Sequence, residues 1–289
     1  MSGTLYLVST PIGNLEDITL RALRILREEV TRIACEDTRQ TRKLLDHYGI
    51  TKPLLSYHEH NEAARTAEIV ELLRAGESIA LASDAGTPLI SDPGYRVVHA
   101  AIEQGLAVVP LPGASAALGA LAASGMATDE FRFIGFLPSK SGARCKVLEE
   151  LRNEPATVIA YESPHRIVET LRDVAEILGA RRRVTVAREL TKLHEEFLRG
   201  TAETVHRDLA VRPAVKGEIT LVIGKGERTE DVSFDPHAEV LRLQEEEGYP
   251  RMEAIKAVAK RAGLPKREVY RLFAEEGGSK PPDKNRGSG

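Results

Sequence analysis

Residues 78–94 read SIALASDAGTPLISDPG, and this stretch decides the fold class. The run SIALA is apolar at almost every position and too short for a helix, as is typical of a strand buried on both faces. It ends at Ser83 and Asp84, after which two glycines and two prolines keep the chain in a long irregular loop. A strand covered on both faces belongs to a parallel sheet between layers of helices, so the stretch predicts an α/β fold.

The same unit repeats along the first part of the chain. Short apolar runs that read as strands lie at 4–9, 31–36, 53–57, 78–83 and 106–111. Amphipathic segments such as ITLRALRILREEV (18–30) and NEAARTAEIVELLRAG (61–76) lie between them. In the latter, Asn61 takes the N-cap position and Gly76 ends the helix. We expect residues 1–113 to form an N-terminal α/β domain with a parallel sheet.

The pattern restarts after a helix of small residues, ASAALGALAASG (114–125). Further strand-like runs lie at 131–136, 156–162, 182–189, 195–201 and 218–224, and a helix opens at Ser163-Pro164. LRGT (198–201) leads into a short polar helix, which indicates that part of this sheet is antiparallel. Residues 114–226 therefore form a second α/β domain, of ordinary domain size, beside the first.

The end of the chain differs in character. Residues 225–236 look like a linker, and residues 237–276 read as short helices with AGLPK between two of them, Gly263 ending one and Pro265 opening the next. From Arg251 to Arg271 there are seven Lys or Arg against two Glu. This predicts a basic module of helix-turn-helix character that binds RNA, followed by a disordered tail at 277–289.

Composition excludes several classes of protein. Apolar residues make up 42% and charged residues 29%, as in an ordinary soluble domain, and the chain has no Trp for a single-strand stacking platform. A net charge of −3 speaks against a globally basic nucleic-acid binder. Cys35 and Cys145 form neither a disulfide framework nor a metal cluster. Without a signal peptide or an apolar run of about 18 residues, a cytoplasmic protein is expected.

The loops that follow the strands carry the chemistry, because ligands of open parallel sheets bind outside the carboxyl ends of the strands. STPIGNLED (9–17) and SDAGTPLISDPG (83–94) contain neither a Walker loop nor a dinucleotide fingerprint. Asp17 is expected to cap the next helix. The second loop has no lysine or arginine, and its glycine allows close backbone approach to a ligand. Its acidic residues suit a cationic or hydroxyl-rich ligand better than a polyphosphate.

Four further segments are considered as possible sites. Gly113-Ala114-Ser115-Ala116-Ala117 lacks one glycine of the nucleophile elbow and has no partnered histidine. YHEHN (57–61) lacks the tight Cys/His spacing of a zinc site, so we expect no metal and interpret His58 as a helix-entry or substrate-contacting group. RELTKLHEE (188–196) reads equally well as a site or as a loop of paired charges, and RRR (181–183) as a solvated turn or a phosphate contact.

Seven motifs in order resemble the ribosomal RNA methyltransferase group of the tetrapyrrole methylase superfamily. They are VSTPIGNLEDIT (8–19), CEDTR (35–39), SDAGTPLISDPG (83–94), PLPGASA (110–116), YESPHRI (161–167), RELTK with HEE (188–196) and KGEITLVIG (216–224). The resemblance implies a class III methyltransferase fold, usually homodimeric, that binds S-adenosylmethionine between two α/β domains. It also implies the substrate, the ribose 2′-hydroxyl of a cytidine in the decoding region of 16S ribosomal RNA.

Site residues follow from the resemblance by position. Asp84, Ala85 and Gly86 stand where the superfamily often has Gly-Asp-Pro, which leaves their individual contacts to the donor open. The implied donor-contacting residues are Pro11, Asp84, Ala85, Gly86, Ile90, Ser115, Ala116, Tyr161, Leu190, Glu218 and Ile219.

The reaction implied is an in-line displacement at the methyl group, to which a positioned base would contribute. The candidate bases are Asp37 and Glu59, with Glu36 behind them; a helix cap or an ion pair is the alternative for each. The candidate RNA contacts are Arg39, His58, Asn61, Arg166, Lys256, Lys260, Arg261, Lys266 and Arg267. Two other functions remain open: methylation of a tetrapyrrole, and a non-catalytic ribosome assembly factor that retains the cleft.

Overall fold

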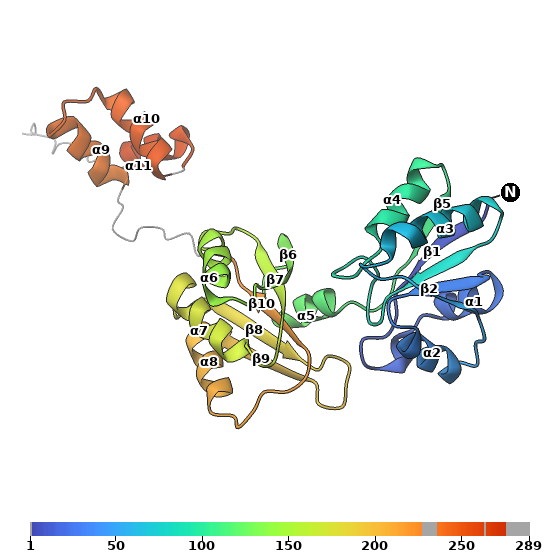
Figure 1. Cartoon of the computed structure of the whole chain (residues 1–289). Coiled ribbons are helices and arrows are strands. Elements are labelled where there is room, and N and C mark those ends of the chain that lie inside the picture. Colours follow the sequence, from blue (N-terminus) through green and yellow to red (C-terminus); the bar gives the residue numbers. More distant parts are fainter. Residues whose placement is uncertain (1, 227–235, 263, 276–289) are drawn as a thin grey trace, which may run out of the picture. The chain divides into compact units, whose positions relative to one another are not determined.

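The computed structural model describes residues 2–226, 236–262 and 264–275 of the chain (Figure 1). It divides into two compact units, Met1–Gly226 and Glu227–Gly289. The larger unit contains both predicted α/β domains, each with its own five-stranded sheet.

The first sheet is entirely parallel, as the sequence predicts. It comprises β1 (Thr4–Val8), β2 (Arg32–Cys35), β3 (Leu54–Ser56), β4 (Ile79–Ala82) and β5 (Ala107–Leu111), in the order β3-β2-β4-β1-β5. The run IALA is therefore the central strand, buried at all four positions. This position explains why its sequence shows no polar alternation.

Helices cover both faces of this sheet (Figure 1). Ile79 and Leu81 pack into a core with α3 (Glu62–Arg74) and α4 (Tyr95–Glu103). Ala80 and Ala82, which point the other way, pack into a second core with α1 (Leu20–Glu28) and α2 (Thr38–His47). The layered arrangement leaves the loops at the carboxyl ends of the strands free to build a site.

The structure corrects the expected cap of α1 and confirms the expected N-cap position of α3. Asp17 does not cap α1, because a short 3-10 turn, η1 (Leu15–Asp17), brings Thr19 to that position, where its hydroxyl accepts from the backbone N–H of Ala22 at 3.1 Å. Asn61 stands at the N-cap of α3 but makes no capping bond. Its side chain accepts from the His58 N–H at 2.9 Å and donates to the Ser56 carbonyl at 3.0 Å. Asn61 therefore closes the loop after β3.

The second sheet is mixed, which confirms the prediction that part of it is antiparallel. It comprises β6 (Phe131–Phe136), β7 (Thr157–Glu162), β8 (Arg183–Arg188), β9 (Glu196–Thr201) and β10 (Ile219–Ile223), in the order β6-β7-β10-β8-β9. Only β6 and β7 pair in parallel.

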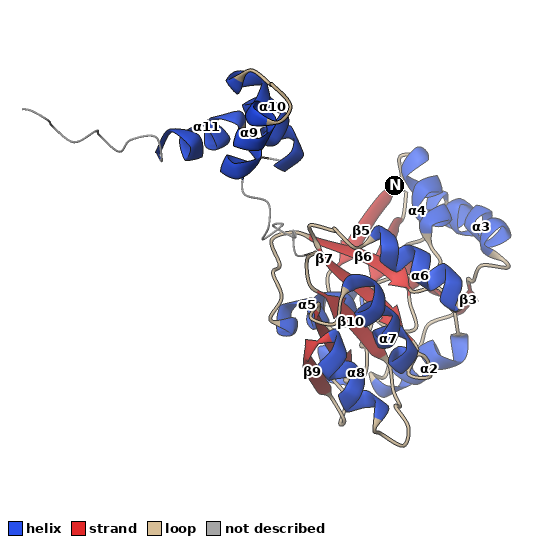
Figure 2. Cartoon of the chain, turned by 90° about the vertical axis from the view of Figure 1, so that its left-hand side faces the viewer, coloured by secondary structure: helices blue, strands red, loops and turns tan. Residues whose placement is uncertain are grey.

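Helices α6 (Ser141–Glu150), α7 (Ile167–Leu178) and α8 (Ala202–Ala210) lie on one face of the second sheet (Figure 2). On the other face lies α5 (Ala116–Ser124), whose Ala117, Ala120 and Leu121 pack against Ile159, Ala187 and Val222. Since α5 is short and rich in alanine, it covers only part of that face. The helix expected to open at Ser163-Pro164 begins three residues later, at Ile167.

The smaller unit consists of α9 (Pro236–Glu245), α10 (Arg251–Ala262) and α11 (Lys266–Glu275). They pack around a core of their own that includes Val240, Leu243, Ile255, Val258 and Val269. Gly263, residues 227–235 of the expected linker and the expected tail at 277–289 lie outside the described residues. Within the described ranges, every helix is too short or too polar to span a bilayer.

Candidate functional site

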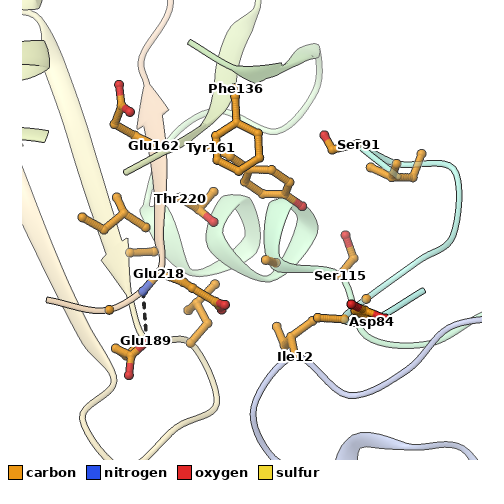
Figure 3. Close-up of a pocket in the computed structure, with 18 of the residues that line it drawn as sticks. Ile12, Asp84, Ser91, Ser115, Phe136, Tyr161, Glu162, Glu189, Glu218 and Thr220 are labelled. Carbon is orange, nitrogen blue, oxygen red and sulfur yellow. Dashed lines mark hydrogen bonds between the residues drawn. The ribbon is translucent and has the colours of Figure 1, made fainter. Parts of the chain in front are cut away.

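A cavity of about 760 Å³ lies where the loops of the first sheet meet the open face of the second (Figure 3). The first domain lines it with Ile12, Glu36 and residues 84–87 and 90–92, and the start of α5 adds Ser115 and Ala116. The second domain contributes Phe136, residues 161–164, Ala187, Glu189, Leu190, Lys192 and residues 217–220. Its position matches the rule that open parallel sheets bind ligands beyond the carboxyl ends of their strands.

The loop after β4 forms one wall of the cavity and is held by hydrogen bonds to the loop after β1. Thr10 and Gly86 exchange both backbone hydrogen bonds, at 2.9 and 3.0 Å. The Ser83 hydroxyl donates to the Gly86 carbonyl at 2.8 Å, and Gly86 has φ +84°. This conformation favours glycine. The wall is therefore fixed before any ligand arrives.

Backbone strain is concentrated around the cavity. In the described part of the chain, four residues other than glycine have positive φ: Leu89 (71°), Ser91 (68°), Glu189 (53°) and Thr191 (66°). Leu89 and Ser91 belong to the loop after β4, and Glu189 and Thr191 to the loop after β8. Such conformations persist where the surrounding structure holds them, and they cluster at functional sites.

The loop after β8 joins the second domain to the first. The Thr191 hydroxyl accepts from the Asn14 N–H at 3.1 Å. A Cβ placed on Gly13 would lie 2.4 Å from Cγ of Lys192, so the lysine side chain lies directly on the backbone of the first domain. The Lys192 ammonium pairs with Glu189 at 2.8 Å and with Glu218 at 3.0 Å.

Aromatic rings line the side of the cavity that the second domain provides. Tyr161 on β7 packs edge-on against Phe133 and Phe136, with ring centroids 5.0 and 5.4 Å apart. Burial raises the pKa of the Tyr161 hydroxyl. Phe136 is 62% exposed although it is a large apolar side chain, and it lines the cavity together with Tyr161.

The cavity is anionic. Its described lining contains six carboxylates, Glu36, Asp84, Asp92, Glu162, Glu189 and Glu218, against one cation, Lys192, which two of them neutralise. Burial raises the pKa of Asp84, and burial together with the charges of Glu36 and Asp84 raises the pKa of Asp92 to about 6. Such a surface attracts cations and repels polyphosphates, as the loop sequences indicated.

Ten of the eleven residues that the sequence implied for the methyl donor line this cavity. They are Asp84, Ala85, Gly86, Ile90, Ser115, Ala116, Tyr161, Leu190, Glu218 and Ile219. Pro11 is buried beside the cavity, and its neighbour Ile12 lines it instead. Ser91 and Asp92, at the end of the loop after β4, are also part of the lining.

The three candidate bases differ in their surroundings. Glu36 lines the cavity. The Asp37 carboxylate accepts from the Arg39 N–H at 2.7 Å and caps α2, and its own N–H donates to Asp84 at 3.1 Å. Glu59 is exposed and outside the lining.

The candidate RNA contacts fall in both units. Arg39 is exposed, His58 is half-buried beside Asn61, and Arg166 is paired with the buried Glu162 at 2.7 Å. In the smaller unit Lys256, Lys260, Lys266 and Arg267 are exposed, while the side chain of Arg261 lies outside the described part.

Several lining residues were not predicted from the sequence. Ser91, Asp92, Phe136, Glu162 and Glu189 lie in motifs that the sequence singled out or in a predicted strand, but nothing in their spacing told which side chains face a ligand. Their place depends on how the two domains dock, which a sequence pattern does not contain.

A model of tetrapyrrole (corrin/porphyrin) methylases matches residues 4–206, which include the whole first sheet and four of the five strands of the second. The chain belongs to the tetrapyrrole methylase family. Within this family it is 50% identical over 280 residues to ribosomal RNA small subunit methyltransferase I of Halalkalibacterium halodurans, covering 95% of this chain and 96% of that one. It is 48% identical over 278 residues to the protein of the same name in Bacillus subtilis, with 94% of each chain covered.

Solved tetrapyrrole methylases share the fold. Uroporphyrin-III C-methyltransferase from Thermus thermophilus, complexed with S-adenosyl homocysteine, superposes with a TM-score of 0.53 at 20% identity, over 78% of this chain and 99% of that chain. At this identity the likeness concerns the architecture alone.

Proposed function

We propose that this chain is an S-adenosylmethionine-dependent methyltransferase that methylates the ribose 2′-hydroxyl of a cytidine in the decoding region of 16S ribosomal RNA. The choice of S-adenosylmethionine as the donor rests on the anionic cavity, which both domains line with ten of the expected residues. The acceptor rests on relatives that are about half identical over nearly the full length and bear the name of a ribosomal RNA small subunit methyltransferase.

The cavity fits the donor chemically. S-adenosylmethionine carries a sulfonium cation, an adenosine and an amino-acid end. Asp84 and its neighbouring carboxylates favour the cation, while Tyr161, Leu190 and Ile219 offer apolar surface to the adenosine. The start of α5, at Ser115 and Ala116, brings the positive end of a helix dipole to the cavity, which suits the carboxylate of the amino-acid end.

Positioning accounts for most of the rate enhancement in this proposal. When bound, the donor supplies an electrophilic methyl group. Gly86 and its hydrogen-bonded loop fix one wall, and the Lys192 pairs with Glu189 and Glu218 fix the opposite one. Two rigid walls hold the reactants in line. The entropy lost in bringing them together is then lost on binding and does not add to the barrier of the chemical step.

RNA binding is assigned to the smaller unit together with residues near the cavity. Exposed Lys256, Lys260, Lys266 and Arg267 present positive charge for phosphates. Arg39 and Arg166 are proposed to meet phosphates beside the acceptor nucleotide, with His58 and Asn61 in the adjoining loop.

The active form is proposed to be a cytoplasmic homodimer. Large apolar side chains on the larger unit support this, since Tyr95 is 71% exposed, Ile102 59% and Leu118 54%. Sedimentation equilibrium of the full chain tests the dimer directly.

Binding and transfer assays test the function. Titration calorimetry with S-adenosylmethionine is expected to give saturable binding, and the protein is then expected to transfer a labelled methyl group to small-subunit ribosomal RNA or particles. A folded protein that binds no donor would favour a non-catalytic assembly factor. Transfer to a precorrin and not to RNA would favour tetrapyrrole methylation.

A further inference from the structure

Most carboxylates of the cavity already have partners. Glu162 is buried and accepts hydrogen bonds from the Ser163 N–H, the Arg166 guanidinium and the Thr170 hydroxyl. Glu189 and Glu218 share Lys192, and Asp84 accepts from the Asp37 N–H. A carboxylate that is fully used by such bonds is a poor proton acceptor.

Asp92 differs from these residues. It lines the cavity, and among the described residues its carboxylate has neither a hydrogen bond nor an ion pair. The backbone on both sides of Asp92 has positive φ, at Ser91 (68°) and Gly94 (142°). The Gly94 N–H donates to the Glu62 carboxylate at 3.2 Å, which ties this end of the loop to α3.

The surroundings of Asp92 come from three strands. Glu36 follows β2, Asp84 follows β4, and Tyr161 lies on β7; each interacts electrostatically with the Asp92 carboxylate. Asp92 therefore lines the same cavity as Glu36 and the proposed donor residues Asp84 and Tyr161, within electrostatic reach of each of them.

We propose that Asp92 is the general base that takes the proton from the acceptor hydroxyl during methyl transfer. The assignment rests on the proposed function. In the step, the hydroxyl oxygen forms a bond to the methyl carbon, and the carbon–sulfur bond breaks with its electron pair remaining on sulfur. The proton moves from the hydroxyl to an Asp92 carboxylate oxygen and later to water, so charge and atoms balance.

Titration of Asp92 gives the proposal a signature. Burial, then Glu36 and Asp84, raises the pKa of Asp92 to about 6. The carboxylate is thus ionised at neutral pH yet more basic than an ordinary aspartate, as efficient general bases are. The remaining charged groups of the lining, Glu162, Glu189, Lys192 and Glu218, are paired among themselves or with Arg166. The methyl-transfer rate should therefore fall below about pH 6.

The test compares wild type with Asp92→Asn in single-turnover methylation of small-subunit particles. The asparagine variant is expected to lose at least about 100-fold in rate and to lose the acidic limb of the pH profile. Its donor affinity is expected to fall by less than about tenfold, far less than the rate, because five other carboxylates of the described lining remain. Glu36→Gln is expected to move the acidic limb to lower pH, because a neighbouring negative charge is gone. Asp46→Asn, on the exposed side of α2, is the control for a lost surface charge.

A second readout needs no turnover. The carboxyl carbon resonances of ¹³C-labelled aspartates in the donor-free protein should include one that titrates near pH 6 and is missing in Asp92→Asn. If wild type transfers a methyl group and Asp92→Asn does so at the same rate with the same pH profile, the assignment is wrong while the function stands. If wild type transfers none to RNA, the proposed function falls and takes the assignment with it. An Asp92 resonance that titrates at an ordinary aspartate pKa also overturns the assignment.

Discussion

The hydroxyl of Thr191, in the second domain, accepts a 3.1 Å hydrogen bond from the backbone N–H of Asn14, in the first. Thr191 makes this contact from a left-handed backbone conformation, with φ 66°. The strained loop after β8 thus holds the loop after β1 at one end of the cavity. Domain docking and ligand binding are therefore expected to be coupled through this contact.

Replacing Thr191 by valine removes the acceptor and keeps the shape of the side chain. A net hydrogen bond contributes about 1 kcal/mol, so the dissociation constant for the donor should rise about fivefold. Calorimetric titration measures it. An unchanged constant would mean that the two loops stay in place without this bond.

Gly13 tests the same contact from the other side. A Cβ there would lie 2.4 Å from Lys192 Cγ, so Gly13→Ala should displace Lys192 from Glu189 and Glu218 and weaken donor binding at least tenfold. Gly142→Ala is the matched control, because a Cβ at that position on α6 meets nothing within 4 Å. Equal donor affinity in the two variants would show that Lys192 does not shape the cavity.

Alanine substitutions at Gly86 and Gly49 distinguish the effect of backbone strain on stability from an effect on donor binding. Gly86→Ala and Gly49→Ala both place a side chain on a left-handed backbone, with φ +84° and +63°, and each should cost about 1 kcal/mol of folding stability. Gly86 lines the cavity, whereas Gly49 lies in open space. Chemical denaturation should therefore report similar losses, while only Gly86→Ala should lose donor affinity. A comparable affinity loss in both variants would indicate a general effect of destabilisation.

The strands and the parallel first sheet could be predicted because burial on both faces leaves a direct mark on sequence. IALA has no polar position since helices cover both of its faces. The helix caps were harder to predict, since Asp17 and Thr19 are both good caps and the 3-10 turn that ends at Asp17 leaves Thr19 as the cap of α1. That choice depends on the path of the loop, which local sequence does not determine.

The sequence predicted the lining residues that stand in turn-rich loops at strand ends. It did not predict those whose position depends on how the two domains pack against each other. Asp84, Gly86 and Ser115 stand in turn-rich motifs at strand ends, so topology placed their loops at the ligand-binding edge of the sheet, and the family resemblance implied their contacts to the donor. Phe136 and Asp92 line the cavity only because the second domain packs against the loop after β4. Asp37 was a candidate base from the sequence, and its position immediately before α2 also makes it the cap of that helix, the alternative that the sequence offered.

Glu196 is expected to make stability depend on pH. Its hydrogen bonds to Arg212 (2.7 and 2.8 Å) and to Arg188 (3.0 Å) lower its pKa to about 2. A lowered folded-state pKa stabilises the protein above the unfolded pKa of about 4.3 and loses that effect as pH falls through the folded value.

Glu196→Gln should therefore cost about 1 kcal/mol at pH 7, after allowance for solvent screening, and the difference from wild type should close between about pH 4 and pH 2. Glu71→Gln, which removes an exposed partner of Arg74, should cost almost nothing and serves as the control. Denaturant unfolding at several pH values measures both. A difference from wild type that does not change with pH would contradict this role for Glu196.

Charge reversal in the smaller unit is expected to lower the affinity for RNA and to leave the affinity for the donor unchanged. Lys256 and Lys260 are exposed one turn apart on α10, so replacing both by glutamate should weaken RNA binding at least tenfold and reduce its salt dependence, with donor affinity unchanged. Replacing Lys140 and Lys146 of the larger unit by glutamate changes the net charge equally and is the control. Filter binding at several salt concentrations distinguishes them. Equal losses would assign the effect to overall charge.

Methylation of a ribose 2′-hydroxyl of small-subunit RNA can be measured by incubating small-subunit particles from cells that lack the protein with the purified chain and labelled S-adenosylmethionine. The RNA is then hydrolysed with alkali, which spares the bond beside a 2′-O-methylated ribose. We expect label in one alkali-resistant dinucleotide that begins with a cytidine of the decoding region. Label on a base, or a folded protein that binds the donor and leaves the particles unlabelled, would contradict the proposed function.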